Sequence, residues 1–260
     1  MGLQLNHVTM RFGGLTAVGD LTGEIEPTGL VGLIGPNGAG KTTVFNVITG
    51  VYSPTEGDVM FHGKSLRGLK TNQITHSGIA RTFQNIRLFK GMSVFDNIRV
   101  SFSSKTDNKT FGTLARFGGF YTEEKAIAAK IDKLLEFFNL SHARDEFATS
   151  LPYGDQRRVE IVRALATDPK LLLLDEPAAG MNPTEKQSLM KLIRQIRDEF
   201  QIAVLLIGHD MSLVMGVCEK IMVLDYGVKI AEGTPKEISS NKRVIEAYLG
   251  EVVDGEHAHA

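Results

Sequence analysis

The stretch GLVGLIGPNGAGKTT, residues 29–43, decides the fold of this 260-residue chain. It opens with a short apolar run that ends at Ile34, and a run of this length bounded by glycine is typical of a buried strand. Residues 35–42 then fill every fixed position of the pattern G-x-x-x-x-G-K-[ST]. The glycines let several backbone N–H groups turn toward one anion, and a helix beginning near Lys41 adds the positive end of its dipole. The stretch therefore predicts a strand, a phosphate-binding loop and a helix, in that order.

The side chains of this loop suit a nucleotide that carries a divalent cation. Lys41 can reach the β- and γ-phosphates, and the hydroxyl of Thr42 can ligate Mg²⁺. A chance glycine-rich turn is the alternative, but the strand pattern before the loop and the helical pattern after it disfavour that interpretation. We therefore predict ATP and Mg²⁺ as cofactors, with nucleotide contacts from Asn37, Gly38, Gly40, Lys41, Thr42 and Thr43.

The stretch LLLLDE, residues 171–176, supplies the acidic partner that such a loop requires. Four leucines predict a buried strand, and Asp175 emerges at its carboxyl end, where open parallel sheets bind ligands. We predict that Asp175 holds the Mg²⁺ shell and that Glu176, one residue further, polarises an attacking water. A solvated acidic pair at a strand end is the alternative, which the phosphate-binding loop makes less favourable.

Short apolar runs bounded by Gly, Asp or Pro recur along the chain and predict the fold class. They alternate with helical patterns, which implies an α/β protein with a mostly parallel sheet covered on both faces. One helix is expected after Asn182, which with Pro183 and Glu185 forms a capping pattern. The strand-length runs are GLVGLIG, KLLLLDE, IAVLLIGHD and KIMVLDYG.

The middle of the chain has a different pattern. From about residue 91 to 165 we find helical spacing and no strong strand, so we expect a helical lobe inserted into a core formed by residues 1–90 and 166–250. Residues 103–122 lack periodicity and are expected to form a loop. The polar residues 251–260 are expected to form an unstructured tail, which leaves a single domain over residues 1–250.

Composition excludes several classes of protein. The net charge of −1 offers no general attraction to nucleic acid, so no nucleic-acid partner is expected. The single cysteine, Cys218, excludes an internal disulfide, and it is expected to be a small buried residue at a helix end. No apolar run approaches the roughly 20 residues of a spanning helix, and the N-terminus lacks a secretory pattern. We therefore expect a cytosolic chain.

Two further polar residues are expected at the carboxyl edge of the sheet. Gln84 closes the strand-like stretch GIARTFQ, and His209 follows the apolar run AVLLIG. Taken singly, a glutamine or a histidine at a strand end is more often structural. In this order after these strands, Gln84 and His209 suit two roles, a γ-phosphate sensor and a residue that positions the catalytic groups. Gln84 is also expected near the metal.

The order of these motifs resembles that of the ATP-binding cassette ATPases over nearly the whole chain. The resemblance rests on the P-loop, Gln84, LPYGDQRR at residues 151–158, LLLLDEP, AGMNP and His209. It implies a P-loop NTPase fold of the RecA-like type, with an antiparallel β portion near the N-terminus besides the parallel core and helical lobe. It also implies a head-to-tail dimer, in which LPYGDQRR contacts the nucleotide bound by the other subunit.

The stretch LPYGDQRR corresponds to the signature of this family and departs from its usual form, L-S-G-G-Q. Pro152 replaces the serine and removes a hydroxyl donor and a backbone N–H, while Tyr153 replaces a glycine and Asp155 the glutamine. We expect backbone N–H groups at Tyr153 and Gly154, with Asp155 beside them, to meet the partner's nucleotide at the helix start. A helix start without any ligand is the alternative.

A closer resemblance is to the ATPase subunits of branched-chain amino acid importers. It rests on RTFQNIRLFKGMSVFDNI, AGMNPTE and the stretch from HDMSLV to GTPKEI. It implies that Phe12 stacks on adenine with Val18 nearby, and that Asn182 also reaches the dimer partner. It further implies that Leu88 and Phe89 meet a transmembrane permease subunit at the cytoplasmic face of the inner membrane, although these two residues could equally belong to the core of the lobe.

Other functions remain open from the sequence alone. A cassette for another small substrate such as urea or an amide fits the same motifs. A soluble cassette ATPase that acts on nucleic acid or ribosomes is a further alternative, but such proteins usually show tandem cassettes or basic extensions, and this sequence shows neither. A small-molecule kinase would need an acceptor pocket and has no use for Glu176, the signature and His209 together. The sequence does not identify the transported substrate, or whether the dimer pairs two copies of this chain.

Overall fold

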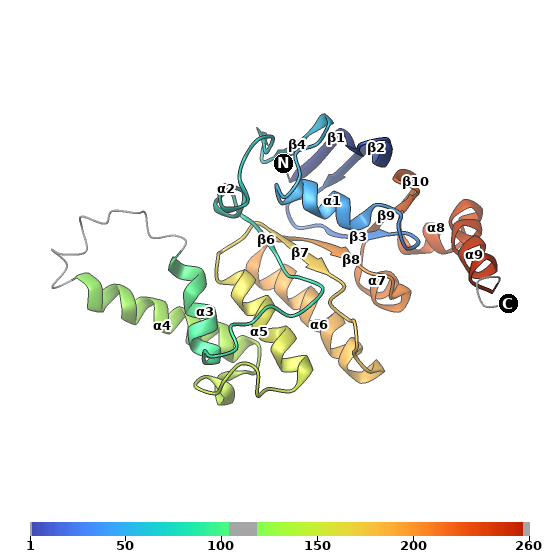
Figure 1. Cartoon of the computed structure of the whole chain (residues 1–260). Coiled ribbons are helices and arrows are strands. Elements are labelled where there is room, and N and C mark those ends of the chain that lie inside the picture. Colours follow the sequence, from blue (N-terminus) through green and yellow to red (C-terminus); the bar gives the residue numbers. More distant parts are fainter. Residues whose placement is uncertain (1, 104–118, 257–260) are drawn as a thin grey trace. The chain divides into compact units, whose positions relative to one another are not determined.

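The computed structural model describes residues 2–103 and 119–256, which divide into two compact units (Figure 1). The sheet unit comprises residues 1–81 and 170–260, and the helical unit comprises residues 82–169. The sequence placed the lobe at residues 91–165. The structure divides the chain earlier because the backbone after Arg81 is hydrogen-bonded to helix side chains of the helical unit.

The sheet unit holds a six-stranded sheet of order β10-β9-β3-β8-β7-β6 and a four-stranded antiparallel sheet of order β2-β1-β4-β5. In the larger sheet all neighbours are parallel except β9 and β10, which form a hairpin. The predicted P-loop fold class is confirmed, including the antiparallel portion near the N-terminus. The strands are β1 (Leu3–Phe12), β2 (Leu15–Ile25), β3 (Leu30–Ile34), β4 (Glu56–Phe61), β5 (Lys64–Ser65), β6 (Ile79–Arg81), β7 (Leu171–Asp175), β8 (Ala203–Ile207), β9 (Lys220–Asp225) and β10 (Val228–Gly233).

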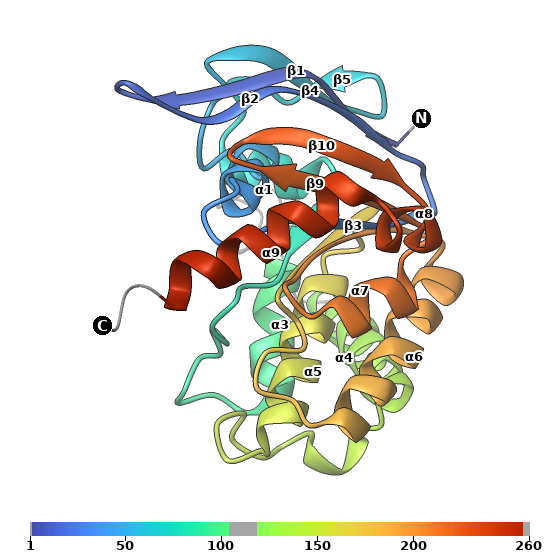
Figure 2. The ribbon, with the colours of Figure 1, turned by 90° about the vertical axis from the view of Figure 1, so that its right-hand side faces the viewer.

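Helices cover both faces of the six-stranded sheet (Figures 1 and 2). α1 lies between the two sheets, and its Val44, Phe45 and Ile48 join the core that the two sheets share. α6 and α7 cover the opposite face, where a Cβ on Gly32 would meet Val214 at 2.8 Å. The helices of this unit are α1 (Lys41–Ile48), α2 (Thr71–His76), α6 (Pro183–Phe200), α7 (Met211–Val217), α8 (Pro235–Ser239) and α9 (Lys242–Glu256).

Local sequence sets the start of α6, as predicted. The Asn182 side chain accepts from the amides of Thr184 and Glu185, and the Glu185 carboxylate accepts from the amide of Asn182. Pro183 occupies the first helical position, where the N–H that proline lacks would have no partner within the helix.

Cys218 is the C-cap of α7 and is buried, which raises the pKa of its thiol to about 12, as expected for a structural cysteine.

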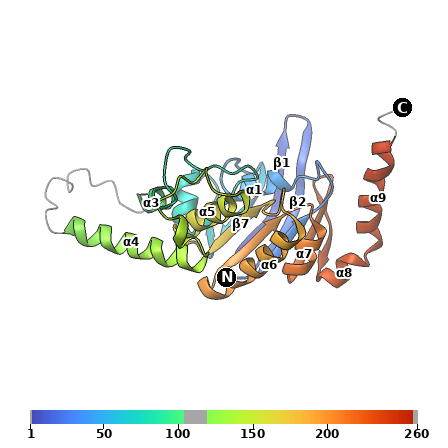
Figure 3. The ribbon, with the colours of Figure 1, turned by 90° about the horizontal axis from the view of Figure 1, so that it is seen from below.

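The helical unit is built from α3 (Val94–Ser103), α4 (Gly119–Phe137), a short 3₁₀ helix (Ser141–Ala143) and α5 (Tyr153–Leu165). α3 contacts both α4 and α5 (Figure 3). Most of the loop predicted at residues 103–122 lies outside the described residues, and α4 begins at Gly119. Apolar side chains of α4, among them Ile131 and Leu135, are fully buried.

The ends of β6 and α9 differ from the sequence predictions. β6 ends at Arg81, so the prediction that Gln84 closes this strand is wrong. The backbone of Phe83 bonds to side chains of α5 instead of to β7, which ends the strand early. Residues 251–256 of the expected tail lie in α9, and residues 257–260 lie outside the described residues. In the described part of the chain, no helix is long and apolar enough to cross a bilayer.

Candidate functional site

The loop between β3 and α1 requires glycine at two positions. Gly35 has φ 152°, and a Cβ there would lie 2.1 Å from the carbonyl oxygen of Leu224. Gly40 has φ 97°, and its Cβ would lie 2.4 Å from the carbonyl oxygen of Ala17. Beside Gly38, in contrast, no atom lies within 4 Å of the added Cβ, so this side of the loop is open. Close contacts at Gly35 and Gly40 therefore restrict the conformation of the loop backbone, whereas the space beside Gly38 is open.

Lys41 and the start of α1 make this loop a cationic cradle. The buried ammonium of Lys41 donates to the carbonyls of Gly35 at 2.6 Å and Pro36 at 2.7 Å. The helix is capped by Gly40, which makes no side-chain cap bond, and its first turn contains no acidic residue. Its positive end is therefore not neutralised locally, which favours an anion there. Thr42 is exposed and Thr43 half-buried at the same helix start.

Asp175 ends β7 as predicted, and it is bound by an arginine that the sequence analysis missed. Arg81 donates from Nη2 to Oδ2 of Asp175 at 2.8 Å, and both side chains are largely buried. Nη1 of Arg81 donates to Oδ1 of Asn46 in α1 at 2.8 Å, and the guanidinium lies over the Phe45 ring. One arginine therefore connects the acidic strand end to the helix that follows the phosphate loop.

Glu176 and His209 are brought together by the parallel pairing of β7 and β8. Asp175 is in register with Ile207, and the amide of Glu176 donates to the carbonyl of Ile207. Nδ1 of His209 lies 3.5 Å from Oε1 of Glu176. Glu176 has φ 47°, a left-handed conformation that is uncommon for a residue with a side chain and that clusters at functional sites.

A small cavity of about 100 Å³ adjoins this pair and includes two residues that the sequence did not indicate. Lys186 of α6 forms an ion pair with Asp210, whose carboxylate also accepts from Ser212 and from the amide of Leu213. Burial raises the pKa of Asp210, but these hydrogen bonds outweigh it and hold the pKa at about 2. Asp210 therefore stays charged and fixes the backbone next to His209.

Val18 of β2 lies close to the phosphate loop, and Phe12 lies on the neighbouring strand β1. Phe12 ends β1, is 41% exposed and packs edge-on against Tyr52, with ring centroids 5.1 Å apart. Val18 is buried and lies close to Gly40, since its Cγ2 would be 3.4 Å from a Cβ there. Phe12 thus presents an aromatic surface to solvent on the unit that carries the loop. Tyr52 was not predicted, because no sequence pattern pairs it with Phe12.

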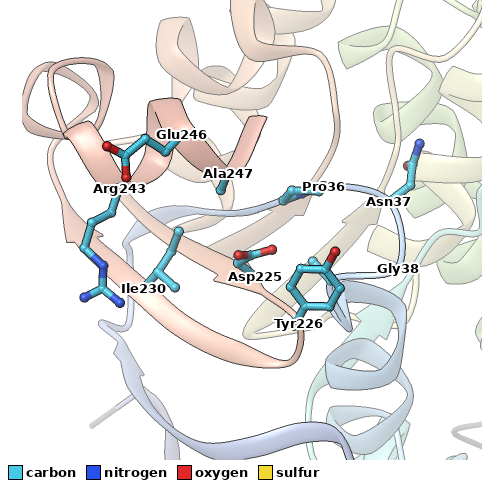
Figure 4. Close-up of a pocket in the computed structure, with 10 residues that line it drawn as sticks. Pro36, Asn37, Gly38, Asp225, Tyr226, Ile230, Arg243, Glu246 and Ala247 are labelled. Carbon is cyan, nitrogen blue, oxygen red and sulfur yellow. The ribbon is translucent and has the colours of Figure 1, made fainter. Parts of the chain in front are cut away.

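A larger cavity, of about 530 Å³, flanks the phosphate loop (Figure 4). Asn37 and Gly38 border it from the loop, Tyr226 from the turn between β9 and β10, and Arg243 and Glu246 from α9. The side chains of Lys41 and Thr42 are not part of its lining.

The remaining predicted residues lie together in the helical unit. α5 begins at Tyr153 after the N-cap Pro152, so Gly154 and Asp155 occupy its first turn, as predicted for a helix start. Asp155 places a negative charge there, and Arg158 compensates it at 3.3 Å. Gln84 is exposed, and its carbonyl accepts from a buried arginine of α5.

The donor set fits ATP with Mg²⁺ better than a metal alone. Among residues 2–103 and 119–256, no group of three His, Cys, Asp or Glu side chains is placed to hold an ion. Mg²⁺ is commonly bound by one or two carboxylates together with substrate phosphates. A hydroxyl at Thr42 and a carboxylate at Asp175 match that pattern, and the open space beside Gly38 suits a phosphate. The fold and site thus define a P-loop nucleotide-binding protein.

Comparisons with known proteins specify this class. The family model described as ABC transporter matches residues 18–179, and that described as branched-chain amino acid ATP-binding cassette transporter matches residues 228–254. The chain therefore belongs to the ABC transporter family, and it is an ATP-binding cassette ATPase.

Relatives and solved structures agree with this assignment. The chain is 44% identical over 249 residues to the high-affinity branched-chain amino acid transport ATP-binding protein LivG of Escherichia coli K12, covering 96% of this chain and 98% of that protein. It is equally similar to BraF of Pseudomonas aeruginosa, with the same coverage. A solved ATP-binding cassette of an ABC transporter in its ADP conformation superposes with a TM-score of 0.84 at 31% identity, covering 95% of this chain and 98% of that one.

Proposed function

We propose that this chain is the ATP-hydrolysing subunit of an importer for branched-chain or other amino acids. Residues 1–250 would form one cassette domain that works with transmembrane permease subunits at the cytoplasmic face of the inner membrane. The observation that carries the proposal is the phosphate loop together with the Asp175–Glu176 and His209 arrangement. It occurs in a chain that is 44% identical to LivG over 96% of its length. The family model at residues 228–254 supports the same substrate class.

We assign each site residue the role that the order of the motifs implies. The loop amides and Lys41 bind the phosphates, while Thr42, Asp175 and Gln84 would hold Mg²⁺, which would supply charge neutralisation at the β- and γ-phosphates. Glu176 accepts the proton of the attacking water. His209, 3.5 Å from Glu176, orients that carboxylate and can contact the γ-phosphate.

We propose that two such cassettes close head to tail around two ATP molecules. The start of α5 presents the backbone N–H groups of Tyr153 and Gly154 to the γ-phosphate held by the partner, which is a second copy of this chain or a related cassette. The γ-phosphate is the bridging charge, so ATP favours closure and ADP does not. Phe89 is 47% exposed, which suits contact with a permease, whereas Leu88 is half-buried.

Uptake by the assembled transporter tests the proposed substrate. Reconstituted with the permease subunits of an amino acid importer in liposomes that hold MgATP in the lumen, with the ATPase on the lumen side, the chain should drive ATP-dependent uptake of labelled leucine, isoleucine or valine. In matched vesicles that carry Glu176→Gln, the rate of uptake should fall by about 10²–10⁴-fold, because a general base contributes on this scale. Uptake of urea or acetamide in place of these amino acids would contradict the proposed substrate and favour the urea or amide alternative.

A further inference from the structure

Arg157 and Glu160 of α5 form an ion pair in the interior of the helical unit. Nη1 of Arg157 lies 2.7 Å from Oε2 of Glu160, and the two side chains are 0% and 2% exposed. Burying two charges is costly unless additional hydrogen bonds satisfy both groups. We therefore expect the remaining donors and acceptors of this buried pair to form further hydrogen bonds.

Both members of the pair form hydrogen bonds with the backbone of Phe83, and Arg157 also bonds to that of Gln84. Arg157 donates to the carbonyl of Phe83 at 2.7 Å and to the carbonyl of Gln84 at 2.8 Å. Glu160 accepts from the amide of Phe83 at 3.3 Å. The backbone that presents Gln84 is thus fixed by side chains from α5.

The same guanidinium also reaches the unusual residue of the signature. Nη2 of Arg157 donates to the hydroxyl of Tyr153 at 3.1 Å, and the guanidinium carbon lies 5.8 Å from the Tyr153 ring centroid. A glycine at this position would offer no side chain to bind. Tyr153 is therefore connected through Arg157 to the backbone at Gln84.

A second arginine of α5 holds the segment further along. Arg163 donates to the carbonyl of Arg87 at 2.6 Å, and its guanidinium lies 5.7 Å from the ring centroid of Phe89. Residues 83–89 are therefore attached to α5 at two separate points. A displacement of α5 along or about its axis would carry this segment with it.

We propose that Arg157 is a positioning residue that makes the start of α5 and residues 83–89 move as one body. A nucleotide that contacts Tyr153 would then alter the position of Gln84 and Phe89 through Arg157. The inference rests on the proposed function, in which α5 meets the partner's ATP and Phe89 meets the permease. Only an arginine suits this task, because its planar fork can donate to two carbonyls and a hydroxyl at once, whereas lysine is a point donor.

Amide hydrogen exchange on the full chain tests the connection directly. In a Glu176→Gln background, Arg157→Lys keeps a charge beside Glu160 and should fold, yet exchange in residues 83–89 should accelerate by about tenfold or more, as expected for lost charge-assisted hydrogen bonds. Tyr153→Phe removes only the hydroxyl. It should leave exchange in the absence of nucleotide nearly unchanged but abolish any change that ATP produces in residues 83–89.

Arg99→Lys is the matched control, because Arg99 forms a partly exposed ion pair with Glu124 in the same unit. It should leave exchange in residues 83–89 as in the parent. Unchanged exchange in Arg157→Lys would overturn the proposal. So would an ATP response in Tyr153→Phe equal to that of the parent, or acceleration spread evenly over residues 82–102 and 124–169, which would indicate general destabilisation.

Steady-state hydrolysis gives a second readout in the chain that retains Glu176. Arg157→Lys should lower kcat by about tenfold while KM for ATP changes by less than about threefold, because the loop that binds the first nucleotide is untouched. A rise in KM with unchanged kcat would overturn the proposal. If the unaltered chain hydrolyses no ATP, the proposed function fails, but the exchange of residues 83–89 in Arg157→Lys without nucleotide still tests the connection.

Discussion

At the scale of single residues, the site depends on side chains that connect distant parts of the sheet unit. The phosphate loop could be predicted because its residues are consecutive and each has a local reason. Arg81 could not, because its partner Asp175 lies 94 positions away and only the pairing of β6 with β7 brings them together. Lys186 escaped prediction for the same reason, since its bond to Asp210 depends on the packing of α6 beside α7.

We predict that Arg81→Met destabilises the chain by about 3–5 kcal/mol, because it leaves the buried Asp175 carboxylate without its guanidinium. Arg81→Met combined with Asp175→Asn should recover a large part of this loss, since no buried charge then remains at either position. Urea unfolding followed by circular dichroism measures both. A loss below about 1 kcal/mol in the single variant would show that the ion pair does not stabilise the strand ends.

The depressed pKa of Asp210 predicts a stability difference that depends on pH. Its pKa falls from 3.8 in the unfolded chain to about 2 when folded, so the charged carboxylate stabilises the fold by about 2 kcal/mol above pH 4. This contribution is lost as the pH falls through the folded pKa. Asp210→Asn keeps the helix cap and should lie below the parent by this amount at pH 7, with the gap narrowing toward pH 3. A gap in urea stability that is constant from pH 7 to pH 3 would contradict the assignment.

At the scale of elements, local pattern predicted the helix starts better than the strand ends. α6 begins where Asn182, Pro183 and Glu185 predict, because all three act on amides within one turn. β6 ends earlier than GIARTFQ suggests, because Arg157 and Glu160 take the backbone bonds of Phe83 that a longer strand would use. Those two side chains come from a helix more than seventy positions later, so no local pattern could reveal them.

The capping box of α6 gives a prediction at this scale. Asn182→Ala should reduce the free energy of unfolding by about 1 kcal/mol, because the amides of Thr184 and Glu185 lose their acceptor. Asn182→Asp is the control, since its carboxylate can accept the same bonds and also suits the positive helix end. Equal stability of the alanine and aspartate variants in thermal or urea unfolding would show that the cap adds nothing.

At the scale of the whole molecule, the fold class followed from the alternation of strand-length and helix-length patterns, and the family from the order of the motifs. Both are confirmed by the two sheets and by the relatives. What lies beyond one chain is the proposed closure of two cassettes on ATP. We propose that its energetic source is the γ-phosphate, bound at the start of α5 by backbone N–H groups without the serine of the usual signature.

The molar mass of Glu176→Gln in solution, measured by light scattering with MgATP, with MgADP and without nucleotide, tests this account most directly. We predict a dimer with MgATP and a monomer in the other two conditions, because hydrolysis is blocked and only the γ-phosphate bridges the subunits. Lys41→Ala in the same background should remain monomeric throughout, since it loses the phosphate-binding ammonium. A monomer in MgATP at a concentration where bound ATP is measured at one per chain would contradict closure between two copies of this chain.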